Sequence, residues 1–178
     1  MALSKIDAAN FLTGTIPQGN VANASLGAVT ALPAGVGGKV LQVVTATDST
    51  ARFTNSTSYV TASNTLSVSI TPSATSSKVF VVVNTTAYNN NSGKSMSLTI
   101  YRDSSDLGNG TWGMINSYDT NTSGQRTIGQ PTSMSVLDSP SSTSSLTYQV
   151  YAKTESGGET YFNYADIKAS ITAFEIAG

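Results

Sequence analysis

The sequence predicts an all-β fold, an antiparallel β-sandwich of the jelly-roll kind, preceded by an extended N-terminal arm. Three observations carry this prediction. From Lys39 onward, short runs rich in Val, Ile, Thr and Tyr recur at intervals of roughly 8–15 residues, with polar turns between them. Several of these runs alternate apolar and hydroxyl residues, which is the period of a half-buried strand. No segment shows the 3.6-residue period of an amphipathic helix.

Residues 1–38 differ from the rest and predict an arm without a core of its own. They hold six glycines, two prolines and only two charged residues, Lys5 and Asp7. The apolar residues are sparse, follow neither the helical nor the strand period, and are too few to build a core. We expect five of them to anchor the arm on a partner: Ile6, Phe11, Leu12, Ile16 and Val21. A flexible linker or tail is the alternative interpretation.

Residues 39–178 are expected to form the sandwich as one domain. The predicted strands, in chain order, are 39–45, 51–55, 58–61, 65–71, 78–84, 96–101, 132–137, 146–152, 160–164 and 169–176, with an aromatic-bearing stretch at 111–118. In the fourth run, Leu66, Val68 and Ile70 share one face and should point into the core. The run 78–84 is apolar on both faces, which predicts a central strand covered on both sides.

Two further details concern the C-terminal third of the chain. The turn residues at 155–158 predict a hairpin that leads into the strand at 160–164. In the last strand we expect Ile171, then Ala173 or Phe174, and then Ile176 to point inward.

The composition argues against several classes of function. The chain has no histidine and no cysteine, so it has no Ser-His-Asp or Cys-His nucleophile, no disulfide framework and no imidazole or thiolate metal site. Nine Lys and Arg residues lie scattered along the chain and leave a net charge of −1, which argues against a nucleic-acid partner. No apolar run is long enough for membrane insertion. Asp7 interrupts the place of a signal-peptide core, so we expect synthesis in a cytoplasm.

The remaining polar groups do not favour catalysis. Glu155 and Glu159 flank two glycines, and a solvated turn explains them more simply than a pair of glycosidase carboxylates. In the loop 103–110, Asp103, Asp106 and Asn109 offer oxygens for calcium, but their spacing departs from the EF-hand pattern, and an Asx-rich turn is the alternative. We therefore expect no enzyme activity, no cofactor and no metal.

Aromatic and amide side chains in the predicted loops suggest a contact surface for a receptor. A sugar ring stacks on an aromatic face, while amides and hydroxyls bind the sugar hydroxyls. The candidate receptor contacts are Tyr88, Asn90, Trp112 and Tyr118. The alternative is that these residues pack in the core or between subunits.

Several stretches resemble bacteriophage proteins. Ile6-Asp-Ala-Ala-Asn10 and Thr13-Gly-Thr-Ile-Pro17 look like the low-charge, Gly-rich segments of phage fibres. The strand textures at 38–44, 66–72, 78–83, 99–102 and 171–176 resemble a β-sandwich domain of tail-fibre-like and virion structural proteins of phages, notably marine and cyanobacterial ones. The resemblance implies a homotrimer with its N-terminal part on the particle and its sandwich outward. The chain lacks a repeated shaft, which favours a short fibre or surface knob over a long fibre.

These inferences together predict a non-enzymatic virion surface protein, assembled in the host cytoplasm. Residues 1–38 would bind other virion proteins, either a tail adaptor or baseplate protein or the major capsid protein. The trimeric sandwich would attach to the host surface as a short tail fibre or adhesin, with a host glycan as candidate ligand. Two alternatives stay open: a capsid decoration (cement) protein that stabilises the shell, and a carbohydrate-binding module.

Overall fold

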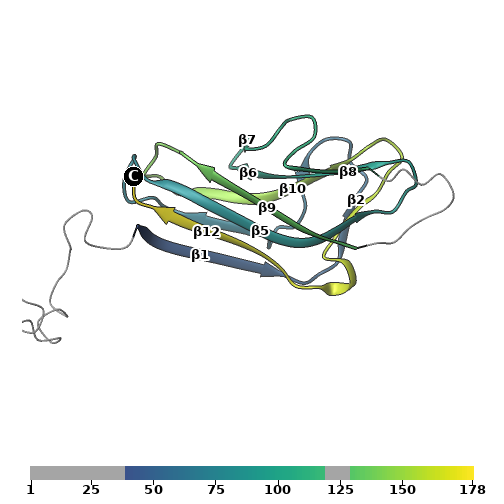
Figure 1. The fold of residues 1–178 in the computed structure, drawn as a ribbon, viewed down its shortest axis with the longest axis horizontal. Helices are drawn as coiled ribbons and strands as arrows, with labels where there is room; N and C mark the ends of the chain where they lie inside the picture. Colours follow the sequence, from purple (N-terminus) through teal and green to yellow (C-terminus); the bar gives the residue numbers. More distant parts are fainter. Residues whose placement is uncertain (1–38, 119–128) are drawn as a thin grey trace, which may run out of the picture. The chain divides into compact units, whose positions relative to one another are not determined.

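Two antiparallel sheets pack face to face to form a sandwich (Figure 1). The computed structural model describes residues 39–118 and 129–178. The elements of these residues are β1 (Val40–Asp48), β2 (Arg52–Thr54), β3 (Val60–Thr61), β4 (Ser67–Ile70), β5 (Lys78–Asn89), β6 (Ser95–Arg102), β7 (Ser105–Asp106), β8 (Ile115–Tyr118), β9 (Gln130–Asp138), β10 (Leu146–Thr154), β11 (Thr160–Phe162), the short 3-10 turn η2 (Tyr164–Asp166) and β12 (Ala169–Ile176). The described residues contain no helix with the length and hydropathy of a membrane span.

The first sheet is built around β5, the longest strand. On one side of β5, β12 pairs with its first half and β11 with its last residues, so these two strands follow one another along the same edge. Beyond them, β1 pairs with β12 and β2 pairs with β11. On the other side, β9 pairs with β5 from Val79 to Ala87. The sheet therefore has four strand positions, and two of them are interrupted.

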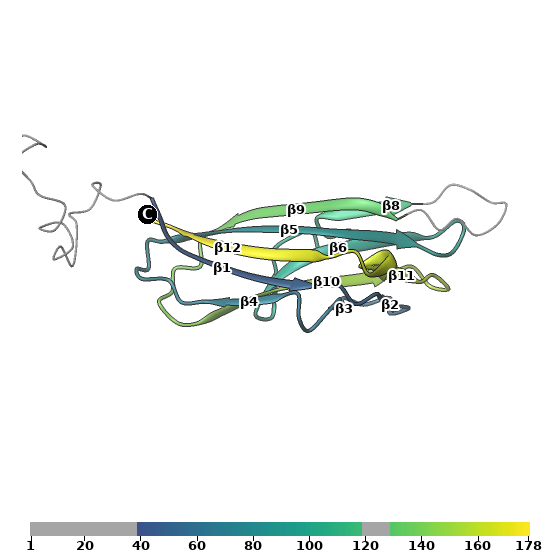
Figure 2. The same ribbon diagram turned by 90° about the horizontal axis from the view of Figure 1, so that it is seen from below.

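The second sheet repeats this plan around β10 and β6, which pair over seven residues. The short strands β3 and β4 follow one another along the free side of β10. On the free side of β6, β7 and β8 do the same. Figure 2 shows the two layers from the side of β1 and β12.

The connectivity is that of a jelly roll. When each interrupted strand is counted once, residues 39–118 and 129–178 have eight strand positions, with the order 1-8-3-6 in the first sheet and 2-7-4-5 in the second. Each neighbouring pair 1-8, 2-7, 3-6 and 4-5 arises when one long hairpin of strands is wrapped into a double sheet, which is the jelly-roll arrangement. The predicted all-β sandwich is thus confirmed, while the predicted arm, residues 1–38, lies outside the described residues.

Alternating apolar residues on β4, β5, β10 and β12 supply most of the core between the sheets, together with the inward residues of β6, whose outer face is buried as well. Val79, Val81 and Val83 of β5 are fully buried, and Leu98 and Ile100 of β6 face them from the other sheet. The predicted inward set of the fourth run is also confirmed, since its three apolar residues are at most 3% exposed. Burying a side chain of this size stabilises the fold by about 1.5–3 kcal/mol.

The structure corrects three details. Phe80 and Val82 of β5 lie on the outer face of the first sheet and are only half-buried, so the described residues cover β5 on one face and not on both. In β12, Ile171 and Ala173 point inward as expected, but Glu175 takes the third inward place instead of Ile176. The turn at 155–158 does not close a hairpin, because β10 belongs to the second sheet and β11 to the first.

Candidate functional site

The five predicted anchor residues, Ile6, Phe11, Leu12, Ile16 and Val21, lie outside the described residues. The four candidate receptor contacts lie within them, and they separate into two pairs on different parts of the sandwich.

Tyr88 and Asn90 lie at the end of β5 in the first sheet. Tyr88 is only 8% exposed, and its ring stacks on that of Tyr161 with the ring centroids 4.9 Å apart. Tyr161 in turn stacks on Phe53, so one aromatic ladder crosses the three strands β5, β11 and β2. The Asn90 side chain donates to Glu159 Oε2 at 3.3 Å. Packing within the sheet therefore occupies most of the surface of this pair.

Trp112 and Tyr118, in contrast, are half-exposed and lie over the outer face of the second sheet. Trp112 belongs to the loop between β7 and β8 and is 51% exposed. Tyr118 ends β8 and is the register partner of Ser95 on β6. Since directly paired residues share one face of a sheet, Tyr118 and Ser95 point to the same outer side.

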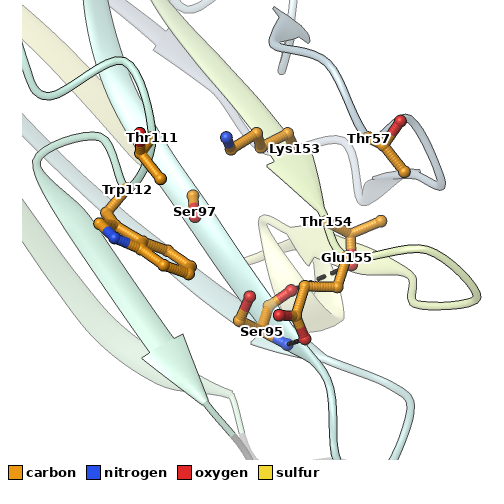
Figure 3. A pocket seen from close by; sticks show the side chains of 8 residues that line it. All are labelled: Thr57, Ser95, Ser97, Thr111, Trp112, Lys153, Thr154 and Glu155. Atoms are coloured by element: carbon orange, nitrogen blue, oxygen red, sulfur yellow. Dashed lines mark hydrogen bonds between the residues drawn. The ribbon is translucent and has the colours of Figure 1, made fainter.

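A hollow of about 230 Å³ opens beside Trp112 on this face. Figure 3 shows the indole lying beside Ser97, with its six-membered ring extending toward Ser95 and Glu155. We call this feature the Trp112 hollow. It is lined by Thr57, Ser95, Ser97, Thr111, Trp112, Lys153, Thr154 and Glu155.

The loop that carries Trp112 is held in place by hydrogen bonds within the loop and by its close approach to β6. Asn109 Oδ1 accepts hydrogen bonds from the amides of Thr111 and Trp112 at 2.8 and 3.1 Å, which is an Asx turn. Gly113 follows with a φ of 69°, and a side chain there would collide with the Leu98 carbonyl oxygen. Only glycine fits so close to β6 in this conformation. The backbone that carries the indole is therefore fixed, although about half of Trp112 faces solvent.

Lys153 and Glu155 place one charge of each sign in the hollow. Lys153 projects from β10, and its ammonium lies 4.7 Å from the centroid of the Tyr59 ring, within cation–π distance. Glu155 follows β10, and its Oε2 accepts the amide of Ser95 at 3.0 Å. The hollow thus offers an aromatic face, an ammonium, a carboxylate and several hydroxyls within one small area.

The tyrosines next to the hollow form a support for Lys153. Tyr101 of β6 stacks on Tyr151 of β10 with the centroids 4.0 Å apart, and Tyr59 packs against Tyr101. Burial raises the pKa of Tyr59 to about 12. The phenol therefore stays neutral at physiological pH, and the Tyr59 ring can hold the ammonium without adding a charge.

In the loop that suggested calcium, Asp103, Asp106 and Asn109 each use one side-chain oxygen within the fold. Asp103 Oδ1 accepts the amide of Thr147, and Asp106 Oδ1 accepts the Thr99 hydroxyl and the Gly108 amide. Together with the Asx turn of Asn109, these bonds join the loop to β10 and β6. The described residues contain no cluster of three or more acidic side chains that could hold a metal ion.

Sequence reasoning singled out Trp112 but missed its polar companions. Lys153 and Glu155 stand two apart at the end of β10, so alternation places both on the outer face with Tyr151. That signal was available in the sequence. Their approach to Trp112 was not, because it depends on how the loop between β7 and β8 folds over β6.

Comparison with known proteins adds little to this description. No protein-family model matches the chain, and no curated protein matches it. Among solved structures, the chain is similar to the VP2 subviral particle of infectious bursal disease virus, with 14% identity and a TM-score of 0.39 over 77% of this chain and 38% of that one. A second structure, the T13 particle of the same virus, gives 14% identity and a TM-score of 0.37 over 77% of this chain and 36% of that one. The chain spans less than two fifths of those proteins, and likeness at this level does not bear on its role.

Proposed function

We propose that this chain is a non-enzymatic structural protein of a bacteriophage particle, a short tail fibre or adhesin that forms a homotrimer. In this proposal, residues 1–38 attach it to the particle and residues 39–178 form the exposed head. The resemblance of its sequence to phage fibre proteins supports this role. The observation that carries it is an uncharged apolar area on the outer face of the first sheet.

We call this area the assembly face. One register row crosses all four strand positions of the sheet with an apolar residue in each: Val43, Phe174, Phe80 and Leu137. Val43 and Leu137, at the two ends of the row, are 55% and 54% exposed. The neighbouring Leu41 is 49% exposed and extends the apolar area along β1.

On one side of the assembly face, the next two rows carry no charged residue, whereas the adjacent row on the other side contains Ile176 paired with Lys78. The next row is Thr45, Thr172, Val82 and Ser135, and the one after it is Thr47, Ser170, Asn84 and Ser133. A contiguous apolar patch with a polar surround is typical of a protein–protein contact. Because β1 and β9 are edge strands among the described residues, association of copies there would also cover their free backbone groups.

The double variant Val43→Ser with Leu137→Ser tests this contact. Each half-exposed side chain should contribute about 1 kcal/mol to association when it becomes buried. We therefore expect the double variant to associate at least tenfold more weakly, and to sediment as a monomer at concentrations where the unchanged chain is a trimer.

The matched control is Thr47→Ser with Ser133→Ala, two rows away on the same face, which should leave the trimer intact. Urea unfolding of both variants shows whether the fold survives. An unchanged chain that sediments as a stable monomer contradicts the trimer, and full association of the double variant contradicts the assembly face.

The anchoring role of residues 1–38 is tested on whole particles. Phe11→Asp with Ile16→Asp places two carboxylates at expected anchor positions, and burial of an unpaired charge is strongly unfavourable. We expect at least a tenfold loss of the protein from purified particles, measured by immunoblot.

The control for this pair is Asn10→Asp with Gln18→Glu, which adds the same charge at neighbouring polar positions. Incorporation of the Phe11 and Ile16 variant at the normal level would show that the anchor lies elsewhere. Cross-linking of the arm distinguishes the two locations: links to a tail adaptor or baseplate protein support a fibre, whereas links to the major capsid protein make the chain a decoration protein.

A further inference from the structure

We infer that the Trp112 hollow binds a single neutral saccharide ring of the host surface. This inference rests on the proposed attachment function and names the ligand class and the site. Three features of the hollow lead to it: its size, the exposed indole, and the balance of its charged groups.

The size of the hollow fits one ring. Clefts that enclose a drug-sized ligand have volumes of roughly 300–1,000 Å³, and the Trp112 hollow, at about 230 Å³, lies below that range. It is a surface depression beside one loop, which suits a terminal sugar and not a long chain. Binding at such a site is weak for one copy, and a trimer would compensate by multivalent attachment to a dense surface.

The indole of Trp112 supplies a flat apolar face for the sugar. Half of this large ring is exposed although a buried indole would contribute more to stability. The Asx turn of Asn109 and the close approach of Gly113 to β6 keep the loop in this conformation. A ligand that stacks on a ring carried by a fixed backbone orders only the side chain, so the entropy cost of binding is small.

The polar groups of the hollow select a neutral ligand with many hydroxyls. The Glu155 carboxylate accepts hydrogen bonds and the Lys153 ammonium donates them, and a sugar hydroxyl can do either. Their charges cancel, so the hollow has no net charge to attract an acidic sugar. The ammonium is already partly compensated by the Tyr59 ring at 4.7 Å, while the carboxylate would repel a second carboxylate.

The chain has one tryptophan, so its fluorescence reports directly on the site. We would titrate the full-length protein with methyl glycosides of glucose, galactose, mannose and N-acetylglucosamine, and with sialic acid as the acidic probe. We expect at least one neutral glycoside to change the emission and to protect Trp112 from acrylamide, with a dissociation constant in the millimolar range. If no neutral glycoside does so, or if only sialic acid does, the inference is wrong.

Variants assign the effect to the hollow by saturation-transfer NMR, which does not need the indole. Trp112→Ala should abolish transfer to the sugar, and Glu155→Gln, which keeps the size of the side chain and an oxygen for the Ser95 amide, should weaken binding at least tenfold. The matched control is Phe53→Ala, because Phe53 is 56% exposed and lies on the other sheet. Equal loss in the control, or none in Glu155→Gln, would overturn the assignment.

The failure of this inference is separable from that of the proposed function. Particles that carry the Trp112→Ala chain should adsorb to host cells at least tenfold more slowly while incorporating normal amounts of protein. If sugar binding is absent but the trimer, the incorporation and the adsorption defect are intact, only the saccharide class is overturned. If adsorption is also normal, the receptor role of the hollow is overturned as well.

Discussion

Glu175→Ala is expected to lower the free energy of unfolding by about 3–5 kcal/mol, because it removes a buried carboxylate that accepts four hydrogen bonds. Glu175 lies on the inward face of β12 and is 1% exposed. Its Oε1 accepts the Ser73 amide, the Ser73 hydroxyl and the Ser77 hydroxyl at 2.7, 2.6 and 2.8 Å, and its Oε2 accepts Gln42 Nε2 at 2.9 Å. These donors come from β1 and from the link between β4 and β5, so one carboxylate joins three segments at the end of the sandwich.

The same carboxylate should make stability depend on pH in the acid range. Burial alone would raise the pKa of Glu175, but the hydrogen bonds from Ser73, Gln42 and Ser77 outweigh it and lower the pKa to about 2 from an ordinary 4.5. A group whose pKa is lower in the folded state stabilises the fold above its unfolded pKa and loses this contribution as the pH falls through the folded pKa. We expect a loss of about 3 kcal/mol between pH 4.5 and pH 2, at about 1.36 kcal/mol for each pKa unit.

Urea unfolding at a series of pH values between 7 and 2 measures both effects. Glu175→Gln keeps the shape of the side chain, but an amide does not titrate in this range. We therefore expect the free energy of unfolding of this variant to fall less between pH 4.5 and pH 2, the acid limb of the stability curve. The control is Glu159→Gln, at a half-buried carboxylate that binds only Asn90 and Tyr161 side chains; it should keep the acid limb of the unchanged chain. An acid limb that is equally steep in Glu175→Gln would show that other carboxylates cause it.

The alternation of apolar and polar residues predicted much of the fold. It failed where the direction of a side chain depends on hydrogen-bond partners that are distant in sequence. The alternation of Leu66, Val68 and Ile70 fixed the face of β4 without further information. In β12 the same rule was ambiguous, because Ala173 and Phe174 are both apolar. The structure resolves it through Glu175, whose inward place is possible only because residues about 100 to 130 positions earlier donate to it.

The other differences between the predicted and the observed structure lie on the outer faces of the two sheets. The apolar residues Phe80 and Val82 predicted a covered strand, and in the described residues they form part of an exposed face instead. A run that is apolar on both sides indicates burial in the assembled protein, which the fold of one chain need not provide. Trp112 was found by residue type alone, whereas the hollow beside it depends on Lys153 and Glu155, more than 40 residues further along the chain.

The second large effect concerns Asp138, the residue that joins the two sheets at the end of β9. Arg102 Nη1 donates to Asp138 Oδ1 and Oδ2 at 2.9 and 2.8 Å, and the Tyr148 hydroxyl donates to Oδ2 at 2.7 Å. Tyr148 is fully buried in β10, and burial and the hydrogen bond to Asp138 raise its pKa well above the usual range. Asp138→Ala leaves a guanidinium and a buried phenol without their acceptor, so we expect a loss of about 3–5 kcal/mol in urea unfolding.

Two controls compare this cluster with a single hydrogen bond and with a longer ion pair whose arginine is partly exposed. Tyr148→Phe removes one hydrogen bond and should cost about 1 kcal/mol. Arg52→Gln removes the wider pair with Asp48, whose atoms lie 3.4 Å apart and whose arginine is about one-third exposed; it should cost less than about 1 kcal/mol.

A triple variant tests why Asp138→Ala is costly. If the cost comes from the unpaired partners, then Arg102→Met, Asp138→Leu and Tyr148→Phe together should recover most of the lost stability, because an apolar cluster of similar volume leaves no charge or hydroxyl without a partner. If the triple variant is as unstable as Asp138→Ala, the carboxylate itself is required to hold β9 against β6 and β10. A loss below about 1 kcal/mol in Asp138→Ala would contradict both explanations and would mean that water replaces the carboxylate at this edge of the sandwich.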